Sequence, residues 1–351
     1  MKRHRLVNFM ALSFGCVLAT MGWMATTAHA ANGQLHGMTE PRYRVIIDND
    51  FGGDPDGLFQ LAHELLSPSV VVSGIIGSHN YPGGFYGDPG TAEFATKTAG
   101  RLLSVMGLAG KIPLIQGSEG RLTSLTKPNP SEAAKFIVHE AMRDDSRLPL
   151  YVLCGAGLTD IASAYLLEPR IAQRLVVVWI GGPEYPGLDQ PPPGKPHVEY
   201  NLGIDVVAAR VVFNTSTIPI WQVPRDSYRQ CLVSLSELEA RIGGGKLGDF
   251  LLGRLARLEL RAKGRLGEAY VLGDSPLVLL TALQSPWEAD PSSSRYAIMK
   301  APTISESGWY KTNPSGRPIR VYTALDTRLL FEDLFAKIAK FDAHAAPSGA
   351  R

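Results

Sequence analysis

Short apolar runs alternate with amphipathic segments along the first half of the chain. The apolar runs are rich in β-branched residues and predict strands at 43–47, 70–76, 112–115, 148–153 and 174–180. The segments between them predict helices at 58–66, 91–106, 131–143 and 158–167. Strands that stay apolar over their whole length predict a mostly parallel sheet buried on both faces. The expected fold is therefore α/β, an open, mostly parallel sheet with helices on both faces and a Rossmann-like core.

The second half of the chain is less regular, but it contains no repeat and no clear linker. Prolines predict a loop over 187–197, which a helix at 206–213 and a strand at 218–223 follow. Further helices are predicted over 234–262, 277–283 and 326–341. We expect one domain over 31–341 and a disordered tail over 342–351.

The first 30 residues have the layout of a secretory signal peptide. A basic start over 2–5 precedes an apolar run over 9–24, and Ala28-His29-Ala30 ends the segment with small residues. The apolar run is short and interrupted, which favours cleavage after Ala30 over a membrane anchor. We therefore expect a periplasmic or secreted protein that has no membrane contact once the signal peptide is removed.

Composition excludes two classes of partner. The chain is 45% apolar and 19% charged, which is typical of a globular protein. Its net charge of +2 falls below zero when the three basic residues of the leader are lost. The mature chain therefore lacks the excess of positive charge that binds nucleic acid. After the leader, no apolar run reaches the ~20 residues that span a bilayer. Cys154 and Cys231 remain and predict two separate buried thiols rather than a disulfide framework.

Four aspartates within one short segment give the strongest chemical signal. Asp48, Asp50, Asp54 and Asp56 follow the first predicted strand directly and precede a predicted helix. Carboxylates at this density repel one another, and a hard cation such as calcium, which prefers several oxygen ligands, relieves the repulsion. Two glycines between Asp50 and Asp54 let the turn close tightly. The alternative interpretation is a solvated acidic turn.

Further polar motifs follow later strands. In a parallel sheet the ligand lies at the carboxyl ends of the strands, so these motifs are candidates for the same site. They are Ala156-Gly157-Leu158-Thr159-Asp160, Gly181-Gly182, Glu199-Tyr200-Asn201 before Asp205-Val206-Val207-Ala208-Ala209, and Gly273-Asp274. Together with the aspartates they resemble, in order and rough spacing over 43–340, the motifs of the inosine–uridine-preferring nucleoside hydrolase family.

The resemblance implies calcium-dependent hydrolysis of the N-glycosidic bond of ribonucleosides or a related ribosyl compound. The products are base and ribose. The calcium ligands would be Asp50, Asp56, the backbone carbonyl of Thr159 and the side chain of Asp274. Asp54 would act as general base on a metal-bound water.

Ribose binding is implied for Asn80, Glu199, Asn201 and Asp274. For Glu199 and Asn201 the alternative is capping of a loop. The implied partner is a small-molecule nucleoside or ribosyl substrate, and family members are commonly homo-oligomers.

Two departures from the family pattern affect the site. The family has two adjacent acids in the turn, whereas Pro55 separates Asp54 from Asp56 here. We favour Asp56 as ligand and Asp54 as base; the alternative makes Asp54 the ligand. The family asparagine after the second strand is displaced as well, and either Asn80 or Ser78 takes its place.

A third departure concerns the leaving group. The family histidine that helps to protonate the leaving base is replaced by Gly273. Candidates for its role are His79, His197, Trp179, Trp221, Tyr200 and Tyr228, of which the two histidines lie in polar loops and the others are expected to pack in the core. The base specificity is therefore left open.

Two other functions compete with the hydrolase. One is a binding protein on the same scaffold, with calcium but without turnover, which fits the departures at Pro55 and Gly273. The other is a phosphatase of the haloacid-dehalogenase type, in which Asp48 would become phosphorylated.

Overall fold

The computed structural model describes residues 39–287 and 292–345. These residues belong to one compact unit, Thr39–Arg351. The predicted signal peptide over 1–30 lies outside the described residues, so its cleavage stays a prediction. No helix in the described ranges is long and apolar enough to cross a membrane.

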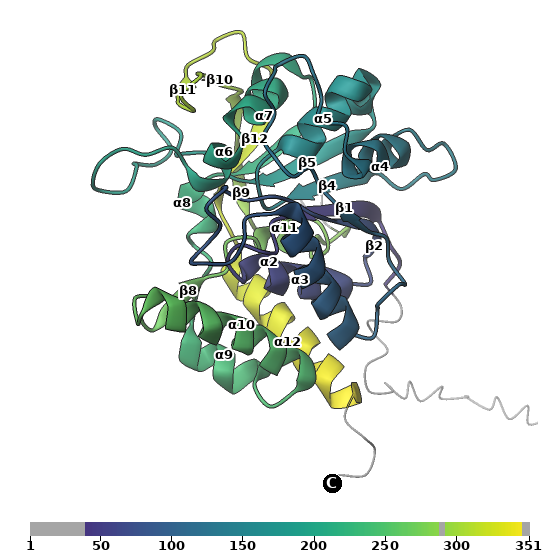
Figure 1. Cartoon of the computed structure of the whole chain (residues 1–351), viewed down its shortest axis with the longest axis vertical. Helices are drawn as coiled ribbons and strands as arrows, with labels where there is room; N and C mark the ends of the chain where they lie inside the picture. Colours follow the sequence, from purple (N-terminus) through teal and green to yellow (C-terminus); the bar gives the residue numbers. More distant parts are fainter. Residues whose placement is uncertain (1–38, 288–291, 346–351) are drawn as a thin grey trace, which may run out of the picture. The chain divides into compact units, whose positions relative to one another are not determined.

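A central sheet of eight strands runs through the described part of the chain (Figure 1). Its order is β3-β2-β1-β4-β5-β6-β12-β9, and all neighbours are parallel except β12 and β9. The chain adds β2 and β3 on one side of β1 and then places β4 on the other side, which creates a topological switch point. The strands are β1 (Tyr43–Asn49), β2 (Val70–Gly77), β3 (Leu114–Gln116), β4 (Leu150–Cys154), β5 (Leu175–Ile180), β6 (Ile220–Val223), β9 (Arg295–Lys300) and β12 (Pro318–Ala324).

Helices cover both faces of this sheet (Figure 1). The helices α4, α5 and α7 lie on one face, and α2, α3, α11 and α12 lie on the other. The helices are α2 (Asp56–Leu65), α3 (Ala92–Val105), α4 (Glu132–Ala141), α5 (Thr159–Leu167), η1 (Pro169–Gln173), α6 (Tyr200–Ile204), α7 (Val206–Arg210), η2 (Val211–Thr215), α8 (Arg225–Tyr228), α9 (Leu235–Ile242), α10 (Lys246–Ala262), α11 (Pro276–Leu279) and α12 (Thr327–Ala345). Two small ladders pair β7 (Leu232–Ser234) with β8 (Ala269–Val271) and β10 (Thr303–Ile304) with β11 (Tyr310–Lys311).

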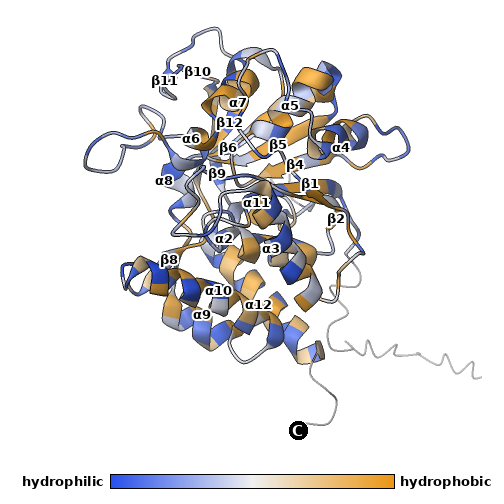
Figure 2. Cartoon of the chain, viewed as in Figure 1, coloured by the Kyte–Doolittle hydropathy of each residue, from blue (hydrophilic) through white to orange (hydrophobic). Residues whose placement is uncertain are grey.

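Alternate side chains of the central strands enter two separate apolar cores. On β1, Val45 and Ile47 join the core that includes α2 and α12, whereas Ile46 joins the core that includes α4 and α5. All three side chains are fully buried. Figure 2 shows hydrophobic strands between helices whose hydrophilic residues lie mostly on their outer surfaces. The open α/β sheet with helices on both faces, predicted from the continuous apolar runs, is confirmed.

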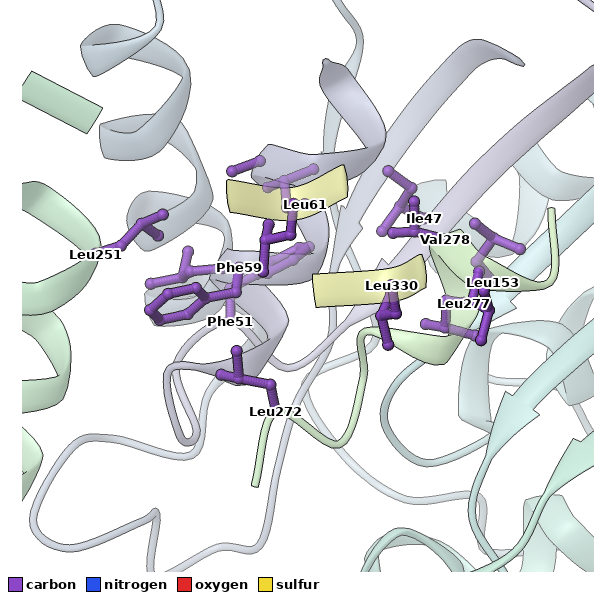
Figure 3. Packing of buried hydrophobic residues seen from close by; sticks show 14 of the residues in the cluster. Ile47, Phe51, Phe59, Leu61, Leu153, Leu251, Leu272, Leu277, Val278 and Leu330 are labelled. Atoms are coloured by element: carbon purple, nitrogen blue, oxygen red, sulfur yellow. The ribbon is translucent and has the colours of Figure 1, made fainter. Parts of the chain in front are cut away.

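The core that includes α2 and α12 also contains residues from the two segments that carry acidic side chains, the turn after β1 and the segment before α11. Phe51 follows Asp50, Leu272 precedes Gly273-Asp274, and both apolar side chains are fully buried. Figure 3 shows Phe51 and Leu272 beside Phe59 of α2. Burial of one such side chain stabilises the fold by about 1.5–3 kcal/mol. Packing therefore fixes the turn after β1 and the segment before α11 in one region.

The structure differs from the predicted elements at several boundaries. The long helix predicted over 234–262 is two helices, α9 and α10, because Gly243-Gly244-Gly245 interrupts it. Helix α12 continues to Ala345, so residues 342–345 are helical rather than part of a disordered tail. The strands β9 and β12 were not predicted. Four of the six β9 residues are exposed, and an edge strand of this kind lacks the apolar run that marks a buried one.

The cysteines are separate buried thiols, as predicted. Cys154 lies at the end of β4 and Cys231 lies just before β7, and both are free. Burial raises the pKa of both thiols above the ordinary value. Since the thiolate is the reactive form, neither thiol is suited to nucleophilic chemistry.

Helix α2 carries a buried acid at the end remote from the aspartate turn. Glu64 is fully buried, and the Thr281 hydroxyl lies 3.4 Å from its Oε1. Burial raises the pKa of Glu64 to about 8, although the nearby Lys337 opposes the shift. Because the pKa of Glu64 is higher in the folded state than in the unfolded state, protonation of Glu64 stabilises the folded state. This stabilisation is complete at low pH. It is lost as the pH rises through about 8.

Replacing Glu64 with glutamine is expected to stabilise the protein at alkaline pH. Glutamine keeps the shape but cannot ionise, so the variant escapes the cost of burying a carboxylate, on the order of 2 kcal/mol at pH 9. The free energy of urea unfolding, measured at pH 6 and pH 9, should favour E64Q increasingly as the pH rises. The exposed Glu237, replaced in the same way, should show no such trend. Equal pH trends in both variants would contradict this interpretation.

Candidate active site

The aspartate turn opens at the carboxyl end of β1, next to the switch point. Asp48 and Asn49 are the last residues of β1, Asp50 to Pro55 form the turn, and Asp56 begins α2. In the register of the sheet, Asp48 lies between Ile76 of β2 and Cys154 of β4. The ends of three strands therefore meet at this edge, where ligands bind in open α/β sheets.

A close approach at Gly53 shapes the turn. A Cβ atom at this position would lie 2.8 Å from Asn80 Nδ2 and 3.0 Å from Asp50 Oδ2. The Gly53 amide also donates a hydrogen bond to the Asp50 carbonyl at 2.6 Å. Only glycine leaves space for the Asp50 carboxylate and the Asn80 amide to approach each other here.

A cavity of about 260 Å³ lies above this turn. Six of the predicted site residues line it, and they come from the turn, from the region of α6 and from the segment before α11. These residues are Asp50, Asp54, Asp56, Glu199, Asn201 and Asp274. The structure thus brings together residues that are more than 200 positions apart in the sequence.

Asn49 links the two acidic segments. Its Nδ2 donates to Asp274 Oδ2 at 2.9 Å, and the Asp274 amide donates to Asp56 Oδ2 at 3.1 Å. Asp56 Oδ1 also accepts a hydrogen bond from the Gly57 amide at 2.8 Å. Asn49 was not predicted as a site residue, although its position between Asp48 and Asp50 is a signal that could have found it.

The cavity concentrates negative charge. Burial raises the pKa of Asp50 and Asp56 well above the ordinary range, and the charge of Asp274 raises both further. Burial also raises the pKa of Asp274 to about 8, and Asp54 adds to that shift. Such repulsion between buried carboxylates is what a bound cation relieves.

The acids that line the cavity are of the type that binds a hard cation, although they do not form a complete coordination shell. Within residues 39–287 and 292–345, no group of three or more His, Cys, Asp or Glu side chains is already arranged to hold a metal ion. However, Asp50, Asp56 and Asp274 supply oxygen ligands to one cavity and are held at a cost in mutual repulsion. Oxygen-rich, charge-dense sites of this kind suit calcium.

Asp54 differs from its neighbours in environment. Asp50 and Asp56 are buried, whereas Asp54 is partly exposed at the cavity wall. The Tyr270 hydroxyl donates to Asp54 Oδ2 at 2.6 Å and orients the carboxylate. Tyr270 lies on β8, far from the turn in sequence, and nothing in the local pattern marks it as a site residue.

Glu199 and Asn201 cap backbone groups and line the cavity at the same time. Glu199 Oε2 accepts from the amides of Gly182 at 2.7 Å and Leu202 at 3.0 Å. Asn201 Nδ2 donates to the carbonyls of Ile180 at 2.8 Å and Gly155 at 3.1 Å. Capping and substrate binding are therefore compatible, because the capping bonds hold both side chains rigidly at the cavity wall.

Asn80 and Thr159 lie behind the cavity wall rather than among its lining residues. Asn80 Oδ1 accepts a hydrogen bond from the Tyr200 hydroxyl at 2.9 Å, and its side chain also interacts with Asp50. The Thr159 hydroxyl donates to Asp205 Oδ2 at 2.8 Å. Ser78, the alternative to Asn80, donates its hydroxyl to Asp48. Of Asn80 and Ser78, Asn80 is therefore the residue that contacts side chains lining the cavity.

The leaving-group candidates separate into two sets. Tyr200 and Tyr228 line the cavity, contrary to their expected role in the core. His79 is buried against Thr159, at 3.0 Å between Nε2 and Oγ1, and His197 lies 3.2 Å from Arg225. The sequence predicted that both histidines lie in polar loops, but it did not predict which residues surround them. The two tryptophans pack as expected, Trp179 within the core and Trp221 against Tyr151 and Arg320.

The chain matches one protein family over most of its length. The model of the family described as inosine-uridine preferring nucleoside hydrolase matches residues 45–285. A curated inosine-uridine preferring nucleoside hydrolase of Leishmania major is 38% identical over 92 residues. That match spans 26% of this chain and 27% of the Leishmania protein.

Solved structures of nucleoside hydrolases share the fold. A plant nucleoside hydrolase is 19% identical, with a TM-score of 0.63, over 85% of this chain and 99% of that chain. A purine-preferring ribonucleoside hydrolase from Gardnerella vaginalis is 17% identical, with a TM-score of 0.63 and the same coverage. At these identities the likeness concerns the fold, which agrees with the sheet and helix layers described above.

Proposed function

Because this chain belongs to the inosine-uridine preferring nucleoside hydrolase family, we propose that it hydrolyses the N-glycosidic bond of ribonucleosides or a related ribosyl compound. One observation carries the proposal. Four aspartates from two distant segments line the same cavity with Glu199 and Asn201, at the ligand-binding edge of the sheet. This arrangement supplies acids for a cation, a base for water and polar groups for a sugar.

Asp54 is the general base in this proposal. In the reaction, the bond between the anomeric carbon and the base nitrogen breaks, and its electron pair leaves with the base. A water oxygen bonds to the anomeric carbon, and Asp54 accepts a proton from that water. The hydrogen bond from Tyr270 and the partial exposure of Asp54 support this role, since they orient one oxygen and leave the carboxylate at the cavity wall.

Asp50, Asp56 and Asp274, with the backbone carbonyl of Thr159, are the proposed calcium ligands. Calcium bound by these residues would supply Lewis-acid activation of water and would neutralise the charge of the buried acids. The two hydrogen bonds that Asp56 accepts from backbone amides support a ligand role, because they fix its orientation toward Asp274.

Glu199 and Asn201 are proposed to hold the ribose hydroxyls. A ribose hydroxyl can donate to the Glu199 carboxylate and to Asn201 Oδ1, because the Asn201 amide nitrogen already uses both of its hydrogens on the Ile180 and Gly155 carbonyls. Asn80 would support them from behind, through its hydrogen bond with Tyr200. Asp274 would contact the sugar in addition to its ligand role.

A ribose-release screen tests the proposal. Purine, pyrimidine and nicotinamide ribosides would each be incubated with the protein, with a chelator, and with the chelator followed by excess calcium or magnesium. We expect ribose from at least one riboside, loss with the chelator and recovery with calcium. Stabilisation by a riboside without any ribose would favour the binding protein instead.

The phosphatase alternative is not supported by the geometry. It requires Asp48 to attack a phosphate, but Asp48 is 1% exposed, accepts a hydrogen bond from Ser78 and is absent from the residues that line the described cavity. Asp48 lies behind the cavity wall, whereas Asp50 of the same segment lines the cavity.

We also propose that the mature protein acts in the periplasm or outside the cell. The basic start, the apolar run and the small residues before Ala31 support this location. A mature N-terminus at Ala31, determined by mass spectrometry of the exported protein, is the expected result. An intact N-terminus would contradict it.

A further inference from the structure

Among the described residues that line the cavity, none is a histidine. At Gly273, an added Cβ would lie 3.4 Å from Cδ2 of Tyr228 and 3.3 Å from Asp56 Oδ2. The ring of Tyr228 therefore occupies the space beside this glycine. A side chain at position 273 would therefore start in contact with that ring and with the Asp56 carboxylate.

The tyrosine hydroxyls at the cavity are already engaged. Tyr200 donates to Asn80 Oδ1 at 2.9 Å, Tyr228 donates to Glu199 Oε1 at 2.9 Å, and Tyr270 donates to Asp54 Oδ2 at 2.6 Å. A hydroxyl has one hydrogen to donate. None of the three can therefore donate to a departing group without breaking a bond that holds a site residue.

Arg229 is the remaining donor at the cavity. It follows α8 directly, is exposed, and supplies the one cationic side chain among the described residues that line the cavity. On the same helix, Arg225 forms two hydrogen bonds with Glu184, at 2.7 and 2.6 Å. The Arg229 guanidinium forms no hydrogen bond or ion pair in the described ranges, and its charge helps to lower the pKa of the Glu184 carboxyl.

We propose that Arg229 selects substrates whose leaving group is an anion, such as a heterocycle that bears a carboxylate or an acidic ring. This inference rests on the proposed hydrolase function. A guanidinium does not give up a proton at neutral pH, but its fixed donors bind carboxylates and other oxyanions through charge-assisted hydrogen bonds. The site would thus stabilise negative charge on the leaving group rather than protonate it.

The reaction balances without an acid in the protein. The electron pair of the broken bond goes to the ring nitrogen, Asp54 takes the proton of water, and the base departs with its negative charge held at Arg229. The free base then takes a proton from solvent where its chemistry requires one. Nicotinamide gains nothing from Arg229, because the electron pair neutralises its pyridinium ring and the base leaves its riboside without a charge.

Two matched pairs of ribosides test the selection. Nicotinic acid riboside and nicotinamide riboside differ by a carboxylate at one position, and xanthosine and inosine differ by the oxo group that makes the xanthine ring acidic. For the anionic member of each pair, R229M should lower kcat/KM at least about tenfold, the size expected for a lost charge-assisted hydrogen bond. For nicotinamide riboside the change should be below about threefold. For inosine, whose base gains its charge only as it departs, the loss should be smaller than for xanthosine.

Two further variants serve as controls. R229K should retain part of the preference, because lysine keeps the charge and loses the planar fork. Arg257, exposed on α10, provides a matched control, and R257M should leave both pairs unchanged. An equal loss for both members in R229M, or no loss, would overturn the inference.

Binding measurements keep this test separate from the proposed function. If the wild-type protein releases no ribose from any riboside, the hydrolase proposal fails, and calorimetric affinity for the same pairs then tests Arg229. Tighter binding of the anionic member, lost in R229M, would still support selection by this residue. Equal affinity for both members, or no binding of either, would overturn it.

Discussion

Replacing Asp54 with asparagine is expected to lower kcat/KM for riboside hydrolysis by about 10³-fold, the usual effect of a general base. Asparagine keeps the size of the side chain and an oxygen that can accept from Tyr270, but it cannot take a proton from water. The folded structure should therefore persist while turnover is lost. Initial rates of ribose release under saturating calcium, for D54N and the wild type, provide the measurement.

Calcium titrations of D54N and D56N resolve the roles of the two acids around Pro55. D54N should bind calcium with nearly unchanged affinity, whereas D56N should bind it much more weakly. D144N, which changes an exposed side chain paired with Arg174 at the surface, should match the wild type in both respects. Loss of calcium binding in D54N with retention in D56N would reverse the assignment and make Asp54 the ligand.

Replacing Asp274 with asparagine is expected to change stability in opposite directions with and without calcium. In a chelator, D274N should melt about 2–4 °C higher, because it removes one of several repelling buried carboxylates at a gain of ~1–2 kcal/mol. Asparagine can still accept the hydrogen bond from Asn49, so the fold keeps that contact. With calcium the order should reverse, because the wild type gains the free energy of binding and the variant gains little.

Thermal unfolding at fixed protein concentration, with chelator and with a calcium series, checks this reversal. D144N should follow the wild type in both conditions. If D274N melts lower than the wild type in the chelator and rises equally with calcium, Asp274 contributes neither repulsion nor a ligand. That result would remove the late segment from the proposed metal site.

The sequence was sufficient for the sheet, the helix layers and the turn of aspartates. Val45, Ile46 and Ile47 lie in one continuous, β-branched apolar run, and such a run is typical of a strand buried on both faces. Asp274 could be placed with the turn only through the resemblance to the family. Its link to Asp56 is a hydrogen bond from the Asp274 amide to the Asp56 carboxylate across more than 200 residues, which no local pattern encodes.

The leaving-group wall could not be predicted for a related reason. Tyr228 and Arg229 lie at the end of the short helix α8, and Tyr270 lies on a three-residue strand, so neither element has a periodic pattern. His79 and His197 were the natural candidates from their residue type. The structure instead ties His79 to Thr159 and brings His197 to Arg225, away from the residues that line the cavity.

The most direct test of the central claim is the product stoichiometry in a phosphate-free, calcium-containing buffer. The wild-type protein should release base and free ribose in equal amounts from a riboside that it accepts, because water is the proposed nucleophile. Base release that requires added phosphate and yields a ribose phosphate would contradict the account. The absence of both products from every riboside would contradict it as well.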